Sequence, residues 1–433
     1  MNNYKFFTLA FLIAIFAFIL STCLLVILVD TWDLKGIVGI TSPKIDAYDP
    51  RSVHFGFQPV PDGEHRGKSL NVIWMKPEAA IFGSSVAAEG FNPDNSFWNP
   101  NGAFVAYNYG ISGLSIREME QHFEHIQALK PIKKLLIVLD FFAFNALKPA
   151  IAFEQVKILP FAHRPTYREH LFQIGIKTAL SLEYIKANLH RFRYIDKCMN
   201  FFDGFPSMIK SLIRRLINPQ PTDLKVQKFL KDKQSAQSEQ SMISVLYLGG
   251  KKGFKFEDEK GWSSYEAFKG IIKSAQKNNA EIILLIPPCH AEMLEIIHAL
   301  GLWDAFIEWK RTLVKILNEI ATSNRSCPLI PLWDFNYHNV ITMPPFGSSN
   351  ETGKTPFFSD PIHFNGEVGD YVFSVIYGTP SRNLGLSDTV GVCLNQQNIE
   401  KHLQKITEFK KKYQNENPEF SQGVKDLVNN VVF

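Results

Sequence analysis

Short apolar runs alternate with helix-like stretches along the middle of the chain. Four continuous apolar segments are typical of strands buried on both faces, and a fifth is weaker: Ala79–Phe82, Phe104–Tyr107, Leu135–Leu139, Ile282–Ile286 and Leu329–Leu332. Between them, apolar residues recur at helical spacing around residues 116–126, 268–275 and 306–320. Buried strands that alternate with amphipathic helices predict a mostly parallel sheet between two helix layers, which is a three-layer α/β domain.

The N-terminus carries the longest apolar run. Residues 6–29 contain no charged side chain, and Lys5 and Asp30 flank them. A helix of this length rises roughly 36 Å, which is enough to cross a hydrocarbon core of about 30 Å. A cleaved signal peptide or a lipoprotein site at Cys23 fits less well, because the run is long and continues beyond Cys23. We expect one uncleaved anchor, with the chain beyond Asp30 outside the cytoplasm because Lys5 stays inside.

These patterns divide the chain into four segments. Residues 1–30 form the expected anchor, and residues 31–77 read as a connecting segment rich in Pro, Gly, His and Asp. Residues 78–378 form the α/β domain, which a mainly helical, basic insertion interrupts at about residues 150–260. Residues 379–433 form a C-terminal helical tail, with one helix expected over residues 399–413.

Composition and charge exclude several classes of protein. The chain has 433 residues, of which 45% are hydrophobic, so it is not disordered or of low complexity. Its 46 basic and 42 acidic side chains are too balanced for a protein that mainly binds nucleic acid. The 5 cysteines include no C-x-x-C pair, and the 12 histidines form no H-x-x-x-H pattern. We therefore expect no metal and no cofactor.

The first chemical signal follows the strand over residues 79–82, which runs into Gly83, Ser84 and Ser85. At the carboxyl end of a parallel strand, backbone amides and the positive end of the next helix meet. A serine placed there can be exposed and have a developing oxyanion stabilised. Gly-Ser-Ser is also ordinary turn chemistry, so this signal is weak by itself.

The second signal is the sequence Asp360-Pro361-Ile362-His363. An aspartate three residues before a histidine on a tight turn can reach one imidazole nitrogen. The other nitrogen then remains free to take a proton from a serine. The same spacing also occurs in helix caps and in halves of metal sites, so the pair acquires meaning together with Ser85.

Together the two signals resemble the SGNH (GDSL-type) hydrolase superfamily over residues 78–378, with the insertion set aside. Gly83-Ser84-Ser85 is similar to the first block of that family, residues 108–113 are similar to the second, and residues 360–363 are similar to the fifth. The resemblance implies a flavodoxin-like sheet with Ser85 as nucleophile, His363 as base and Asp360 as its acid partner. It also implies an oxyanion hole formed by the amides of Ser85 and Gly113.

The third block departs from the family pattern G-x-N-D. Here the strand over residues 135–139 runs into Asp140-Phe141-Phe142-Ala143-Phe144-Asn145. The asparagine of this block donates to the oxyanion in the family, and Asn145 is the nearby amide side chain. Asn145 is therefore expected in the oxyanion hole, although it lies several residues late.

One subgroup is resembled in particular, the envelope proteins of alginate-type polysaccharide O-acetylation systems. The features shared with it are the N-terminal anchor, the Gly-Ser-Ser block, the strand end at Asp140 and the Pro-Pro-x-His segment at residues 287–290. The resemblance implies an extracytoplasmic acyltransferase or esterase, on the periplasmic side of the inner membrane in a Gram-negative cell. It implies an acylated glycan or polysaccharide as substrate and a membrane-bound O-acyltransferase as partner. A catalytically weak subunit that binds carbohydrate or a partner is the alternative.

Several other residues follow predicted strands or lie on predicted helices and could contribute to the same chemistry. His290 follows the strand over residues 282–286 and is a candidate substrate contact, whereas adjacent Cys289 is not expected to be activated by it. Asp334 is a rival acid partner for His363, but Asp360 is preferred because its spacing requires no assumption about the fold. Trp303 and Trp309 are expected to pack rather than to stack on sugar rings.

Overall fold

The computed structural model describes residues 75–148, 253–323, 329–343, 357–379 and 390–432, with isolated positions at 65, 68, 69, 71, 72 and 243. The chain divides into two compact units, residues 1–75 with 154–234 and residues 76–153 with 235–433. The description below concerns the second unit. The expected anchor, the connecting segment and most of the insertion lie outside the described residues. Within the described residues, no helix has the length and apolar character needed to cross a membrane.

The second unit is built on one sheet of six strands in the order β2-β1-β3-β4-β5-β6. Its strands are β1 (Ala79–Gly83), β2 (Ala106–Gly110), β3 (Lys134–Val138), β4 (Glu281–Ile286), β5 (Leu332–Asp334) and β6 (Val392–Leu394). The first five pair in parallel, and β6 runs antiparallel to β5. The prediction of an α/β chain with a mostly parallel sheet is confirmed, and the order of the first five strands is the flavodoxin-like one.

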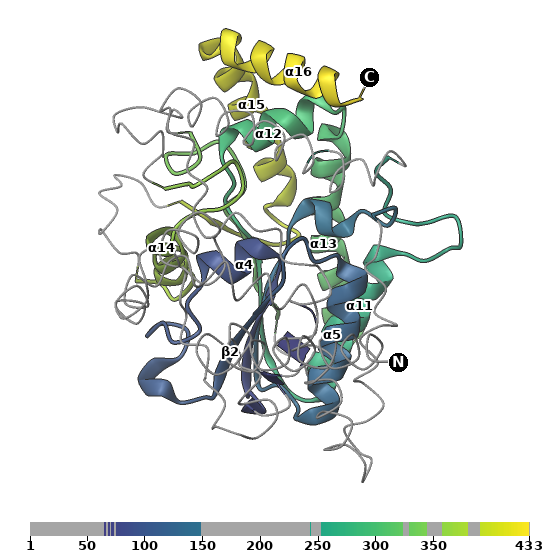
Figure 1. Cartoon of the computed structure of the whole chain (residues 1–433), viewed down its shortest axis with the longest axis vertical. Coiled ribbons are helices and arrows are strands. Elements are labelled where there is room, and N and C mark those ends of the chain that lie inside the picture. Colours follow the sequence, from purple (N-terminus) through teal and green to yellow (C-terminus); the bar gives the residue numbers. More distant parts are fainter. Residues whose placement is uncertain are drawn as a thin grey trace, which may run out of the picture. The chain divides into compact units, whose positions relative to one another are not determined.

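Helices cover both faces of this sheet. Figure 1 shows α4 and α14 on one side of it and α5, α11 and α13 on the other. The helices of the two layers are α4 (Ser85–Gly90), α5 (Ile116–Leu129), α11 (Ser264–Lys277), α13 (Trp303–Ser323) and α14 (Gly366–Ile376). A further helix, α12 (Ala291–Ala299), follows β4 and contacts α13. The apolar residues that predicted α5 are all buried, namely Ile116, Met119, Phe123 and Ile126. The three-layer arrangement follows from this periodicity, because each helix has one apolar stripe to bury against the sheet.

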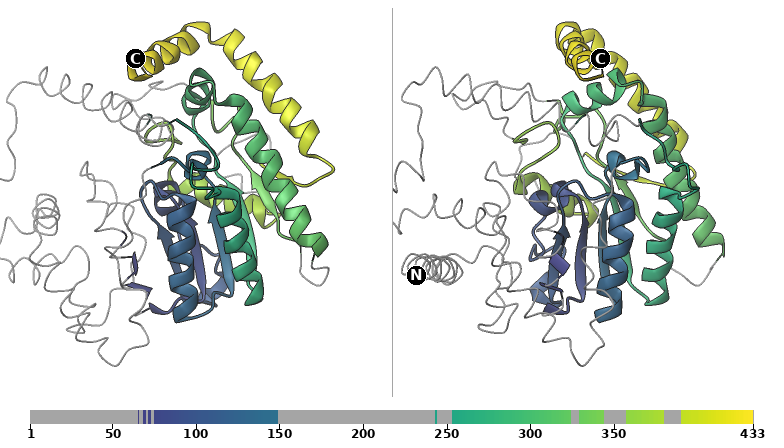
Figure 2. Two further views of the ribbon diagram at one scale, coloured as in Figure 1. Left: turned by 90° about the vertical axis from the view of Figure 1, so that its right-hand side faces the viewer. Right: turned by 45° about the vertical axis from the view of Figure 1, so that its right-hand side comes forward.

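The C-terminal residues close the β5 edge of the sheet. After β6 come α15 (Ile399–Glu416) and α16 (Pro418–Val432). Figure 2 shows α15, in yellow, running alongside α13, and α16 packs on α12. The expected helix over residues 399–413 is confirmed, and α16 and β6 are additions that the apolar pattern did not indicate.

A short buried helix, α4, is held between β2 and α14. The side-chain amide of Asn108 in β2 donates to the carbonyl oxygens of Ala87 and Phe91, both at 2.7 Å. On the other side, a Cβ atom at Gly369 of α14 would lie 1.7 Å from the carbonyl oxygen of Gly90. Only glycine permits this approach, so β2 and α14 both pack closely against the C-terminal half of α4.

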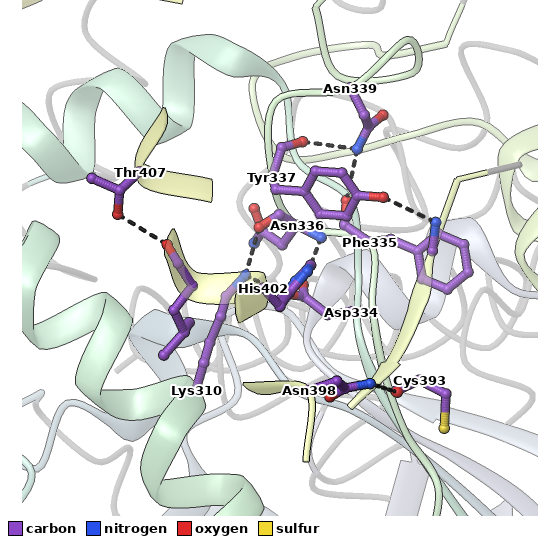
Figure 3. A network of polar contacts seen from close by, with 12 residues as sticks. Lys310, Asp334, Phe335, Asn336, Tyr337, Asn339, Cys393, Asn398, His402 and Thr407 are labelled. Atoms are coloured by element: carbon purple, nitrogen blue, oxygen red, sulfur yellow. Dashed lines mark hydrogen bonds and ion pairs between the residues drawn. The ribbon is translucent and has the colours of Figure 1, made fainter. Parts of the chain in front are cut away.

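A buried charge network joins α13, β5 and α15 (Figure 3). The Lys310 ammonium lies 2.7 Å from Asp334 Oδ2 and donates to the carbonyl oxygen of Asn336 at 2.6 Å. His402 Nε2 lies 2.9 Å from the same carboxylate oxygen. Burial by itself raises the pKa of Asp334, but Lys310 and His402 outweigh it and hold that pKa below its ordinary value. The ion pair joins α13 to β5, and the His402 contact attaches α15 to the same strand.

We predict that Lys310→Met destabilises the protein by about 3–5 kcal/mol, because it leaves the buried Asp334 carboxylate without its cation. The neighbouring substitution Arg311→Met is the control, since Arg311 is partly exposed and pairs with exposed Glu308 and Glu400. It should cost less than about 1 kcal/mol. Urea unfolding of the full chain in detergent, followed by fluorescence of buried Trp303 and Trp309, measures both. Equal losses for the two variants would contradict the assignment.

Candidate active site

Ser85 lies where β1 turns sharply into α4. The strand ends at Gly83, whose missing side chain leaves room for the helix, because a Cβ atom there would lie 2.6 Å from the Cβ atom of Ala87. Ser84 caps the helix, and its hydroxyl accepts a hydrogen bond from the amide of Val86 at 3.1 Å. Ser85 is the first helical residue. The turn therefore places Ser85 at the carboxyl edge of the sheet, as the sequence predicted.

Asp360 organises its own turn. Its Oδ1 atom accepts hydrogen bonds from the amides of Ile362 and His363, both at 2.9 Å. Beyond the turn, Phe358 and Phe364 form an antiparallel bridge that closes the loop. This arrangement leaves Oδ2 of Asp360 directed at the imidazole three residues later.

The structure brings Ser85, His363 and Asp360 together. His363 Nε2 lies 2.7 Å from Ser85 Oγ, and His363 Nδ1 lies 2.5 Å from Asp360 Oδ2. One imidazole therefore joins a hydroxyl on one nitrogen to a carboxylate on the other, although the serine and the histidine are 278 positions apart. This is the geometry of a nucleophile, a base and an orienting acid.

Carboxylates dominate the electrostatics of His363. Burial alone would lower the pKa of the imidazole, but Asp360 outweighs it and, together with Glu89 and Asp140, raises that pKa to about 9. The pKa of Asp360 in turn lies below its ordinary value, because the effect of His363 and the turn amides exceeds that of desolvation. The site therefore favours the imidazolium form of His363.

Asp140 connects β3 to the nucleophile turn. It follows β3 directly and is buried, and burial raises its pKa to about 6 although hydrogen bonds from Ser84 oppose the shift. A carboxyl group at this point holds the cap residue of α4, one position before Ser85. Asp140 is therefore a structural neighbour of the site that binds Ser84 and acts electrostatically on His363.

Two backbone amides are expected in the oxyanion hole, those of Ser85 and Gly113. Within the described residues, neither the Ser85 amide nor the Gly113 amide donates to another protein atom. Gly113 has a φ of 63°, which favours glycine, and its carbonyl oxygen accepts a hydrogen bond from the Lys148 ammonium. An amide that stabilises an oxyanion must be uncommitted in the resting protein, and both meet this condition.

Asn145 has other partners. Its side-chain amide donates to the carbonyl oxygen of Gly253 at 3.1 Å, and its Oδ1 atom accepts from the amides of Leu147 and Lys255 at 3.1 and 3.3 Å. The side chain thus ties the chain before the insertion to residues 253–255, near the end of the insertion. These contacts do not bring Asn145 to Ser85, and its role in an oxyanion hole stays a prediction.

His290 supports the site through its backbone. Its amide donates to the carbonyl oxygen of Pro361 at 2.9 Å, inside the Asp360–His363 turn. Its imidazole Nδ1 accepts from the amide of Glu292 at 3.2 Å and caps α12, and the residue is 1% exposed. The structure therefore places His290 against the Asp360–His363 turn, and its contact with substrate stays a prediction.

The rival candidates are committed elsewhere. Asp334 binds Lys310 and His402, so His363 has Asp360 as its acid partner. The Cys289 thiol donates to Asn336 Oδ1 at 3.1 Å, and burial raises its pKa to about 12, which keeps it protonated. Trp303 and Trp309 are buried in the core, as expected.

Glu89 is the residue of the site that the sequence interpretation missed. It lies on α4 four positions after Ser85, is buried, and places Oε1 3.4 Å from His363 Nε2. Residues at i and i+4 share one face of a helix, so the Ser-x-x-x-Glu spacing could have indicated it. Comparison with known proteins adds no assignment, since no protein-family model and no curated protein matches the chain.

We predict that a fluorophosphonate labels Ser85 and that His363→Ala and Asp360→Asn slow this labelling by roughly a hundredfold or more, because the base or its orientation is lost. Peptide mass spectrometry of the full chain identifies the labelled residue and its rate.

Asp370→Asn is the matched control for this experiment, because Asp370 is an exposed acid on α14 that receives a hydrogen bond from Asn95. It should label at the wild-type rate. Labelling that is equally fast without His363, or that falls on another serine, contradicts the assignment.

Proposed function

We propose that the protein is an O-acyltransferase or esterase that acts through Ser85, His363 and Asp360 on an acylated carbohydrate. The observation that carries the proposal is the pair of contacts on one imidazole, 2.7 Å from Nε2 to the Ser85 hydroxyl and 2.5 Å from Nδ1 to Asp360. A hydroxyl aligned in this way is suited to attack an ester carbonyl. The acyl group we propose is acetyl.

The reaction proceeds in two half-reactions. Neutral His363 takes the proton of the Ser85 hydroxyl as Oγ bonds to the ester carbonyl carbon, and the carbonyl oxygen becomes an oxyanion. The carbon–oxygen bond to the donor then breaks, and His363 returns the proton to the leaving alcohol. In the second half, His363 deprotonates the acceptor hydroxyl as its oxygen bonds to the acyl carbon. The bond from that carbon to Ser85 Oγ then breaks, and His363 returns the proton to Oγ. Water as acceptor gives hydrolysis, and a sugar hydroxyl gives transfer.

The oxyanion is stabilised by the amides of Ser85 and Gly113. Within the part of the chain that the structure describes, neither amide donates to a protein acceptor, which supports this part of the proposal. Removing one such donor typically costs about 10²–10³ in rate. Asn145 does not carry a step here, because its amide group binds backbone around residues 253–255.

The family we propose is the SGNH hydrolase superfamily. Three features support it: the Gly-Ser-Ser block at the end of β1, the Asp360–His363 turn late in the chain and the flavodoxin-like order of the first five strands. A parallel sheet with the nucleophile after its first strand and the base on a late loop accommodates this chemistry. The third block still departs from the family pattern, because Asp140 binds Ser84 and the Asn145 side chain binds the carbonyl oxygen of Gly253.

Transfer is the outcome we favour over hydrolysis. The apolar run at residues 6–29 supports a membrane anchor, and anchoring brings little advantage to an enzyme that cleaves soluble esters. Tethering beside a membrane-bound acyl donor raises the effective concentration to roughly millimolar for a suitable linker. We therefore propose a membrane-bound O-acyltransferase as partner and an envelope or secreted polysaccharide as acceptor.

We predict that the full chain in detergent moves acyl label from a donor ester to a glycan and that Ser85→Ala lowers this transfer at least about a thousandfold. Mass spectrometry of the glycan and of free acid separates the outcomes. Label found only as free acid across several acceptors identifies an esterase. Neither turnover nor an acyl-enzyme with any donor would support the alternative, a subunit that only binds carbohydrate or a partner.

The proposed location is outside the cytoplasm, on the periplasmic side of the inner membrane in a Gram-negative cell. We predict that alkaline phosphatase fused after residue 433 is active, because this reporter needs an oxidising compartment to form its disulfides. A cytoplasmic reporter at the same position should be inactive. The opposite result would reverse the topology without affecting the chemistry of Ser85.

A further inference from the structure

Glu89 stands out because a buried carboxylate faces the same imidazole nitrogen that meets the nucleophile. Its Oε1 atom lies 3.4 Å from His363 Nε2, whereas Ser85 Oγ lies 2.7 Å from it. Glu89 is 7% exposed, and the His363 side chain is 14% exposed. The two oxygens therefore approach Nε2 from adjacent turns of α4, in a setting from which water is largely excluded.

The place of Glu89 in α4 is unfavourable for an acidic residue. α4 covers residues 85–90, so Glu89 lies in its last turn, where the carbonyl ends of the helix repel negative charge. Burial adds a desolvation cost to an ionised carboxyl group. A positive charge on His363 offsets both effects, so the contact with His363 stabilises the Glu89 carboxylate at this position.

The protonation state of His363 decides whether the contact is attractive. A protonated imidazole directs an N–H group from Nε2 that both Ser85 Oγ and Glu89 Oε1 can accept. A neutral imidazole, protonated on the Asp360 side, directs a lone pair from Nε2 at the Glu89 carboxylate, which is repulsive. Glu89 therefore favours the imidazolium.

We propose that Glu89 is a positioning residue that holds the imidazolium of His363 from the Nε2 side and thereby sets the pH range in which Ser85 is activated. The inference rests on the proposed acyl-transfer function, in which His363 must alternate between neutral base and imidazolium acid. Carboxylates then flank both nitrogens of the ring, Asp360 at Nδ1 and Glu89 at Nε2.

The other titratable groups around His363 come from the elements packed against it. Asp140 after β3 acts on the ring at longer range, in the same direction as Glu89. On the α12 side, His290 contacts the loop through its backbone, and its imidazole caps the helix. Glu89 differs from these groups because it touches the nitrogen that exchanges protons with Ser85.

The proposed arrangement has opposite effects on two steps. Stabilising the imidazolium lowers the barrier to proton transfer from Ser85, but it also reduces the fraction of neutral His363 near pH 7. A substitution that removes the charge should lower the pKa of His363 by about one unit, since an opposite charge at this distance shifts a pKa by roughly one to three. It should also weaken His363 as a base.

The experiment compares Glu89→Gln and Glu89→Asp with the wild type in pH profiles of Ser85 labelling by a fluorophosphonate. The acid limb should move to lower pH by about one unit in Glu89→Gln and by less in Glu89→Asp. We assume that about half of the change in the pKa of His363 appears in the rate constant of its neutral form. Glu89→Gln should then label roughly threefold faster than the wild type at low pH, where more His363 is neutral. It should label roughly threefold slower on the alkaline plateau, where His363 is neutral in both proteins but is the weaker base in the variant. Glu367→Gln, which removes an exposed acid in the first turn of α14, is the control and should shift nothing.

A second readout does not depend on Ser85. In the Ser85→Ala full chain, diethyl pyrocarbonate modifies neutral His363, and peptide mass spectrometry follows the midpoint of its modification against pH. The midpoint should fall in the order wild type, Glu89→Asp, Glu89→Gln. A uniform loss of labelling without any shift of either midpoint would indicate a merely structural Glu89 and overturn the inference. If Ser85 showed neither turnover nor fluorophosphonate labelling while the midpoint of His363 modification still shifted, the proposed function would be wrong. The effect of Glu89 on His363 would then still be established.

Discussion

Parallel strand pairing is the constraint on which the site depends. Each of the first five strands begins at the same edge of the sheet, so every intervening segment must return across it, and all five carboxyl ends lie together. β1 pairs with both β2 and β3, which places the end of β1 and the end of β3 side by side. Ser85 follows the first of these ends and Asp140 the second. The loop that carries His363 reaches the same edge, where the amide of His290, after β4, holds it.

The strands that the sequence indicated well are those buried on both faces. β1, β3 and β4 are continuous apolar runs, and their observed limits agree with the expected ones to within one residue at each end. β2 begins two residues later than expected and extends through Asn108. A polar residue ends an apolar run in the sequence, but the side chain of Asn108 is buried because it binds the carbonyl oxygens of Ala87 and Phe91. β5 shifts in the same way toward Trp333 and Asp334. β6 has three residues on an antiparallel edge, too few for an alternating pattern to be recognised.

For the site, local geometry was predictable and long-range geometry was not. The turn from Asp360 to His363 is determined within four residues, so the spacing alone indicated the carboxylate–imidazole contact. The sequence predicts Asn145 in the oxyanion hole because it is the nearby amide side chain. Two of its partners, Gly253 and Lys255, are more than 100 positions away, and a sequence pattern does not indicate such distant contacts. Glu89 was overlooked because an acid on a short helix usually faces water, and only the placement of His363 shows that this one does not.

The separation between Ser85 and His363 has a consequence for biosynthesis. During synthesis the nucleophile emerges long before its base, and any product that stops short of residue 363 contains the serine without the group that would activate it. The intervening sheet must also be complete before the two side chains can meet, and contacts between such distant residues form late because closing the chain costs entropy. Incomplete copies would therefore lack the assembled arrangement of Ser85, His363 and Asp360.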